Sequence, residues 1–229
     1  MRNRIFYFSL PSPTRSALSK AETKLLRDGR IANAVVTRVT IDGARWTVKD
    51  FAARPWYVRW TVAPVLLRHE LSILKRLSGV DGIAARAFRI DRNAIAVEYM
   101  EGDSMGQVPR ERITPEFLCA FEALLDAVHA RGVVHLDARG TGNVMIRPDG
   151  SPGLIDFQAS LTTGWMPGGL RRLLEDIDRS GALKKWAAYR PEEMGEERVR
   201  ELERINRLRR FWVFRGYFGL KKNHAAKRR

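Results

Sequence analysis

The chain has 229 residues, 45% of them hydrophobic, which suits one compact unit or two small lobes around a shared cleft. Its single cysteine, Cys119, excludes an internal disulfide and favours a reducing, cytosolic compartment, and no apolar run approaches the roughly 20 residues of a membrane span. The net charge of +15 indicates a polyanionic neighbour such as nucleic acid, an anionic membrane or a phosphorylated substrate, unless it serves solubility alone.

The N-terminal part predicts a small sheet that carries one helix. Residues 1–20 are rich in proline and serine and predict an irregular arm. Residues 31–51 alternate in strand fashion around Asp42-Gly43, which predicts a hairpin. Leucines recur at helical spacing over 65–77, and two further strands fit within 83–100. We therefore assign residues 21–101 to a small lobe.

The character of the chain changes after Gly102. Thr114-Pro115 predicts the start of a helix that contains Cys119 in its apolar pattern, so we expect this cysteine in the core. Three short strands follow within 133–157, and the chain is helical and charged from about Gly169. Residues 102–199 thus predict a mainly helical lobe, and residues 200–229 form a separate basic segment.

Three polar side chains lie within about twenty positions of one another, each beside an apolar run. Asp137 follows one run, Asn143 begins the next, and Asp156 ends the third. In ATP-dependent phosphoryl transfer, one carboxylate orients the acceptor hydroxyl, while an amide and a second carboxylate hold magnesium on the phosphates. Each residue alone is ordinary at a turn or strand end. Together they predict a site for phosphate and metal.

Two residues of the N-terminal part supply partners for that site. Lys49 ends a strand-like run with buried neighbours, from which it could reach the phosphates of ATP. Glu70 falls on or beside the apolar stripe of the helix 65–77, where a lone carboxylate needs a cation. Lys49 is the natural cation, and the alternative is a solvated Glu70.

The chain resembles the protein-kinase-like superfamily over roughly residues 25–190. The motifs that carry the resemblance occur in the family's order: Val48-Lys49, Glu70, Glu98-Tyr99-Met100, His135-Leu136-Asp137, Asn143 and Asp156-Phe157-Gln158. It is more closely similar to small bacterial atypical kinases related to the RIO kinases and the lipopolysaccharide-core (Kdo and heptose) kinases. These share the long gap from Asp to Asn and a distal segment matched here by Glu175-Asp176, Lys184-Lys185 and Tyr189-Arg190-Pro191-Glu192.

The resemblance implies an α+β, two-lobed kinase-like fold with a small antiparallel sheet lobe and a mainly helical larger lobe. It also implies a role for each matched position. Lys49 and Asp137 would be catalytic, Glu70 would pair with Lys49, and Asn143 and Asp156 would ligate Mg²⁺. The remaining implied positions are Glu98 and Met100 at the nucleotide-contacting hinge, Gly29 in the phosphate loop, and Asp176 as a brace for the catalytic loop.

The sequence departs from the family pattern at three places. Asn143 lies one residue further from Asp137 than in ordinary kinases. The glycine-rich loop is reduced to Gly29, and Gln158 replaces a glycine whose freedom at positive φ an activation-loop flip would need. The segment after Asp156 is too short for a peptide-docking platform, which disfavours a conventional signalling kinase.

Residues 200–229 carry eleven Lys or Arg and only two Glu, interleaved with aromatic residues. This composition suits an anionic membrane surface, or less favourably RNA, or a terminal helix that packs on the larger lobe with solvated arginines.

We therefore expect an ATP- and Mg²⁺-dependent kinase that phosphorylates a sugar or lipid-linked hydroxyl, in the cytoplasm or peripherally on the inner face of a bacterial membrane. The alternatives are a RIO-like serine/threonine protein kinase and a catalytically silent kinase-like scaffold. An aminoglycoside- or choline-type phosphotransferase is disfavoured because its cationic acceptor would require an acidic large lobe.

Overall fold

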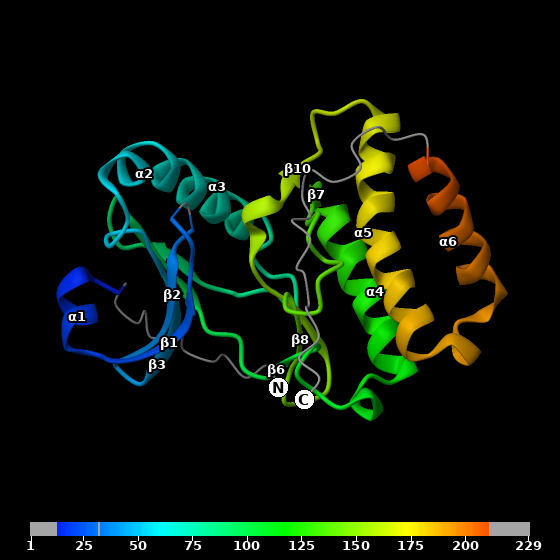
Figure 1. Ribbon diagram of the computed structural model, residues 1–229, viewed down its shortest axis with the longest axis horizontal. Coiled ribbons are helices and arrows are strands. Elements are labelled where there is room, and N and C mark those ends of the chain that lie inside the picture. Colours follow the sequence, from blue (N-terminus) through cyan, green and yellow to red (C-terminus); the bar gives the residue numbers. More distant parts are fainter. Residues whose placement is uncertain (1–12, 32, 211–229) are drawn as a thin grey trace, which may run out of the picture.

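The computed structural model describes residues 13–31 and 33–210, which form an α+β fold with a small antiparallel sheet and several helices. The sheet lies at one end of the molecule and three long helices lie at the other (Figure 1). The long helices are α4 (Pro115–Ala130), α5 (Gly168–Tyr189) and α6 (Gly195–Arg210). The predicted small antiparallel sheet in the first half of the chain and the predicted helices of the second half are thus present.

The sheet has five strands in the order β1-β2-β3-β5-β4, and every neighbouring pair is antiparallel. Their bounds are β1 (Glu22–Asp28), β2 (Val35–Ile41), β3 (Ala44–Asp50), β4 (Ala87–Arg89) and β5 (Ala94–Glu98). The predicted hairpin joins β2 and β3 through Asp42 and Gly43, both at positive φ. The sequence did not predict β1, because all seven of its residues are exposed and carry no alternating pattern.

Helices cover both faces of this sheet. The predicted irregular arm is wrong for its last part, since α1 (Arg15–Lys20) begins at a Thr14 cap and packs Ala17 and Leu18 beside Trp46. On the other face lie α2 (Trp56–Trp60) and α3 (Val62–Arg76), over a core that contains Phe51. The helix predicted at 65–77 therefore starts earlier than expected, because Pro64 is tolerated within the first helical turn.

The second half packs its helices around one large core. Phe117, Phe121 and Leu125 of α4 meet Leu183 and Trp186 of α5 in this core. Short strands and 3-10 turns connect these helices and precede them: β6 (Asp103–Ser104), η1 (Arg110–Arg112), β7 (Val133–Val134), β8 (Val144–Ile146), β9 (Pro152–Leu154), η2 (Phe157–Ala159), β10 (Leu161–Thr162) and η3 (Pro191–Glu193). Within residues 13–31 and 33–210, no helix combines the length and apolar character needed to cross a membrane.

The expectation that Cys119 lies in the core is wrong. The structure places it on the exposed side of α4, whereas its neighbours Phe117, Leu118 and Phe121 are buried. Successive helical residues are about 100° apart, so a position beside an apolar stripe can still face solvent. Because most residues around Cys119 are apolar, the sequence alone did not show that Cys119 is exposed while its neighbours are buried.

Candidate active site

Lys49 lies at the centre of a buried ion-pair cluster. It belongs to β3, which is flanked by β2 and β5, and its side chain is only 7% exposed. Its Nζ is 2.6 Å from Glu70 Oε1 and 2.7 Å from Asp156 Oδ1. The predicted pair of Lys49 with Glu70 is therefore present. The same ammonium also joins the sheet half to the helical half through Asp156.

Periodicity explains why Glu70 reaches Lys49. The buried residues of α3 include Leu67, Glu70 and Leu74, which recur every three or four positions on one helix face. Glu70 therefore points into the core with the leucines instead of into solvent. A buried carboxylate requires a cation, and the ammonium of Lys49 supplies it.

Lys49 and Asp156 stabilise each other's charge, whereas burial, which Lys49 only partly offsets, raises the pKa of Glu70. Burial opposes the charge of Lys49, but Glu70 and Asp156 outweigh it, so the pKa of Lys49 lies above its usual value. Burial likewise opposes ionisation of Asp156, but the charge and hydrogen bond of Lys49 keep the pKa of Asp156 below its usual value. At neutral pH, the site thus holds a fixed ammonium beside a fixed carboxylate.

Asp178 on α5 fixes the backbone that leads to Asp137. Its carboxylate accepts hydrogen bonds from the backbone N–H of His135 at 2.6 Å and from that of Leu136 at 2.7 Å. Leu136 has a φ of 64°, a sparsely populated conformation for leucine that these two bonds help to hold. Asp178 is itself buried, so the bonds act in a poorly solvated setting.

The brace predicted at Asp176 is wrong by two positions. Asp176 instead pairs with Arg204 of α6, through two contacts of 2.9 Å. Two helical positions differ by about 200° around the helix axis, so Asp176 and Asp178 face different neighbours. The Glu175-Asp176 motif predicted that an acid in this part of the chain would brace the loop of Asp137. Only the packing of α5 shows that this acid is Asp178.

Lys185, which the sequence placed only in a matched segment, is a second brace from α5. Its Nζ donates to the backbone carbonyls of Ala138 at 2.6 Å and Arg139 at 3.0 Å. Burial, with a smaller contribution from the charge of Arg139, lowers the pKa of Lys185 to about 8. Asp178 and Lys185 therefore hold the loop before and after Asp137.

Asn143 connects Asp137 with the chain that leads to Asp156. Its Nδ2 donates to Asp137 Oδ2 at 2.7 Å, and its backbone carbonyl accepts from the N–H of Ile155 at 3.0 Å. The longer gap from Asp137 to Asn143 does not separate the two side chains. The loop closes through a bond from the Gly140 N–H to the Asp137 carbonyl.

Asp156 itself stands at a sharp turn, with a φ of 67°. The next residue, Phe157, is buried and packs edge-on against the His135 ring, with centroids 4.7 Å apart. This contact ties the turn of Asp156 to the loop of Asp137. The structure therefore brings Lys49, Glu70, Asp137, Asn143 and Asp156 into one connected region.

Arg27 is a residue of this region that the sequence did not reveal. It extends from β1 and lies 3.5 Å from Asp156 Oδ2, although its side chain is 55% exposed. It is one of 41 lysines and arginines in the chain, and β1 carries no pattern that would single it out. Two cations, Arg27 and Lys49, thus face the two oxygens of Asp156.

The other three residues predicted to contact the nucleotide make contacts of their own. Glu98 on β5 pairs with Arg86 at 2.7 Å, and Met100 packs against Gly153, where an added Cβ would meet the Met100 sulfur. Gly29 lets the chain cross closely over the Ala34 carbonyl. Among the described residues, none of the three makes a hydrogen bond or ion pair with Lys49, Asp137 or Asp156.

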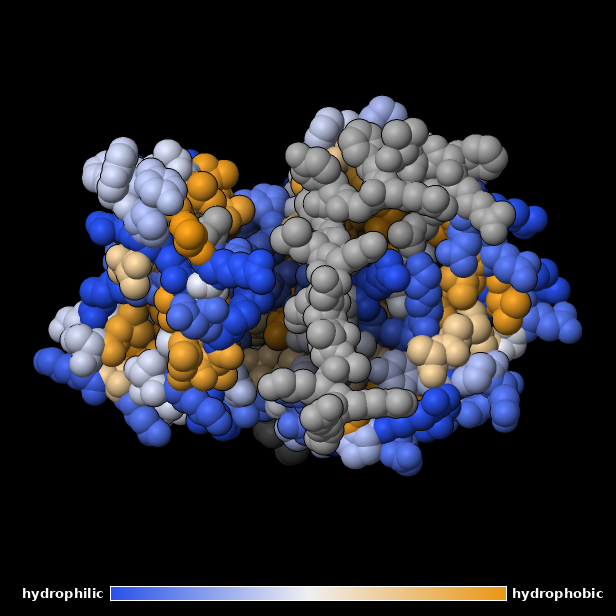
Figure 2. Space-filling model, in the orientation of Figure 1, coloured by the Kyte–Doolittle hydropathy of each residue, from blue (hydrophilic) through white to orange (hydrophobic). Residues whose placement is uncertain are grey.

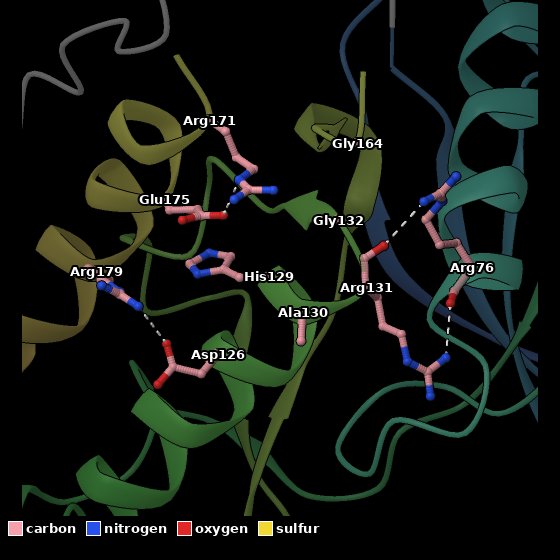
Figure 3. Close-up of a pocket in the computed structure, with 10 residues that line it drawn as sticks. All are labelled: Arg76, Asp126, His129, Ala130, Arg131, Gly132, Gly164, Arg171, Glu175 and Arg179. Carbon is pink, nitrogen blue, oxygen red and sulfur yellow. Dashed lines mark hydrogen bonds and ion pairs between the residues drawn. The ribbon is translucent and has the colours of Figure 1, made fainter. Parts of the chain in front are cut away.

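A separate pocket of about 590 Å³ opens between the ends of α3 and α4 and the start of α5 (Figure 3). Its arginines make internal contacts, in the pairs Arg76–Arg131, Arg171–Glu175 and Arg179–Asp126. None of the predicted site residues lines it. One of its lining residues, His129, contacts Asp178 through Nε2 at 3.1 Å, so the pocket borders the rear of the braced loop.

The chain matches no protein-family model and no curated protein. The chemistry of this region therefore rests on its own geometry.

Proposed function

We propose that the chain is an ATP- and Mg²⁺-dependent phosphotransferase with a two-lobed, protein-kinase-like fold, which moves the γ-phosphoryl group to a hydroxyl. The observation that carries this proposal is the position of Lys49 between Glu70 and Asp156, next to a loop that holds Asp137 and Asn143. This is the division of labour that phosphoryl transfer needs, a cation for the phosphates and carboxylates for the metal and the acceptor.

The residues present fit a magnesium-bound nucleotide. Asp156 stays ionised, and Asn143 uses its amide nitrogen on Asp137, so its amide oxygen is the atom suited to a hard cation. Among the described residues, no three His, Cys, Asp or Glu side chains form a metal cluster, so phosphate oxygens and water would complete the coordination. Bound magnesium would neutralise charge on the phosphates.

Each protein group then has a physical task. Lys49 presents a permanent positive charge to phosphate oxygens, and Glu70 keeps that ammonium in place. Asp137 accepts a hydrogen bond from the acceptor hydroxyl and orients it. Asp178 and Lys185 hold the loop of Asp137 still, because a small displacement of an orienting group lowers the rate strongly.

Arg27 supplies what the reduced glycine loop lacks. A glycine-rich loop presents backbone N–H groups to the phosphates, but here only Gly29 remains of it. The guanidinium of Arg27, already drawn to Asp156, offers charged donors in their place. We therefore include Arg27 among the phosphate-contacting residues.

A sugar or lipid-linked hydroxyl is the acceptor that this chain favours. Only η2, β10 and a short connection separate Asp156 from α5, which leaves little chain to form a peptide-docking surface. The net charge of +15 suits an anionic or membrane-bound acceptor. A RIO-like protein kinase would use the same groups with a protein hydroxyl.

Transfer of labelled phosphate from ATP tests the proposal directly. Purified protein is incubated with membrane, sugar and protein fractions, with Asp137→Ala as the variant and Asp126→Ala, an exposed acid, as the control. We expect Mg-ATP to raise the Tm of all three proteins, while only Asp137→Ala loses transfer. Label in lipid-linked saccharide supports the acceptor, label only in protein supports the RIO-like alternative, and no Tm response to nucleotide supports a silent scaffold.

A further inference from the structure

The turn between α2 and α3 exposes an unusual group of large apolar side chains. Trp56, Trp60 and Val65 are 73%, 59% and 64% exposed, and Tyr57 and Val62 are also exposed. We call these five residues the aromatic elbow. Figure 2 shows apolar and pale atoms gathered over α2 and the start of α3 at the upper left.

The helices α2 and α3 carry apolar side chains on two faces, one buried in the core and one exposed to solvent. Val58, Ala63 and Leu67 already fill the core below it, next to Phe51. A helix that packs against one core needs only one apolar face, and its opposite face is normally polar. A second apolar face in contact with water therefore indicates a binding surface.

The positive charge around the elbow favours a partner with negative charge. Residues 51–69 contain no Asp or Glu, and Arg59 and Arg68 lie among the aromatic positions, whereas Arg54 is paired with Asp28. Arg92 adds a guanidinium at 3.9 Å from the ring centre of Trp60. Tryptophan and tyrosine prefer the boundary between lipid and water, and arginines beside them attract anionic headgroups.

We propose that the aromatic elbow docks on the surface of an anionic lipid bilayer. The indole rings would enter the headgroup region, and the arginines would contact lipid phosphates. Docking does not require the proposed enzymatic activity, although it would suit a lipid-linked acceptor.

The helix that carries Val65 also contacts the other half of the molecule. Val65 lies one helical turn before His69, whose Nε2 contacts the backbone carbonyl of Ser160 at 2.7 Å. The residue after Ser160 is Leu161, which is 40% exposed. A bilayer seated on the elbow would thus contact the helix that carries Glu70, and this helix itself contacts the other half.

Vesicle binding by the full chain tests this surface. Phosphatidylcholine vesicles with and without phosphatidylglycerol are floated with wild type, with the double variant Trp56→Ser/Trp60→Ser and with Val65→Asp. Val199→Asp is the matched control, because Val199 is an exposed valine on α6. We expect binding only to the anionic vesicles, weakened about tenfold or more by the elbow variants and unchanged by the control.

Two results would overturn the proposal. Unchanged vesicle binding in the elbow variants, with circular dichroism showing that they are folded, would assign any membrane contact to another part of the chain. Self-association or RNA binding that the elbow variants abolish, without vesicle binding by wild type, would show that the elbow serves a different partner. Thermal unfolding in the absence of vesicles checks that each variant keeps its fold.

Discussion

Lys49 and Arg27 both present a cation to Asp156, but from very different surroundings. The Lys49 side chain is 7% exposed on a central strand, and that of Arg27 is 55% exposed on an edge strand. A buried ion pair is costly to break, whereas an exposed one contributes little to folding. The comparison teaches that the pair of Lys49 with Asp156 is built into the core, while Arg27 can change without endangering the fold.

Lys49→Met should give the largest effect. Removal of the ammonium leaves Glu70 and Asp156 buried beside each other, and we expect unfolding to become easier by about 3–5 kcal/mol. Phosphate transfer should fall by about a hundredfold or more. Denaturant unfolding and labelled-phosphate transfer measure the two effects. The double variant Lys49→Met/Glu70→Leu should regain stability without regaining transfer; equal stability of wild type and Lys49→Met would contradict a buried ion pair.

Asp178 and Asp176 give the next largest contrast. Asp178→Ala leaves two backbone N–H groups without their acceptor, and we expect a loss of about 2–4 kcal/mol together with a marked loss of transfer. Asp176→Ala removes a contact with the half-exposed Arg204, so we expect about 1 kcal/mol and little change in transfer. Urea unfolding measures the loss of stability in the two variants, and initial rates measure their loss of phosphate transfer. A larger loss at Asp176 would mean that the braced loop is misassigned.

Arg27→Ala should separate nucleotide binding from folding. We expect the KM for ATP to rise about tenfold, since one charged contact to phosphate is lost, and the stability to change by less than about 0.5 kcal/mol. Arg27→Lys should recover part of the affinity. Lys24→Ala, at another exposed cation of β1, is the control. If both alanine variants raise KM equally, general charge and not Arg27 explains the effect.

Lys185 should make a smaller contribution, by causing the stability of the fold to depend on pH. Its pKa of about 8 in the folded protein lies below its usual value of 10.5, so folding releases a proton between these pH values. The unfolded chain then binds more protons, and stability should rise with pH across this window. By pH 9 the gain should be on the order of 1 kcal/mol relative to pH 7. Lys185→Met should lack this rise in denaturation measurements; a parallel pH profile for both proteins would place the lysine in solvent.

Local patterns in the sequence predicted much of the fold and part of the site. Apolar periodicity put Glu70 on the buried face of its helix, and Asp42-Gly43 predicted the hairpin that carries Lys49. These features follow from neighbours within one helix or hairpin, where the periods of 3.6 and 2 decide which way a side chain points. The sequence also assigned Lys49 and Asp156 to one phosphate and metal site, but it did not predict their direct contact.

Only the tertiary structure decided the remaining features. The choice of Asp178 over Asp176, the reach of Arg27 and the exposure of Cys119 all depend on how elements distant in sequence pack. The aromatic elbow is similar, since its apolar residues resemble core residues in the sequence and are distinguished only by what covers them. Burial depends on contacts between residues that are far apart in the sequence, and local sequence patterns do not reveal which of these contacts form.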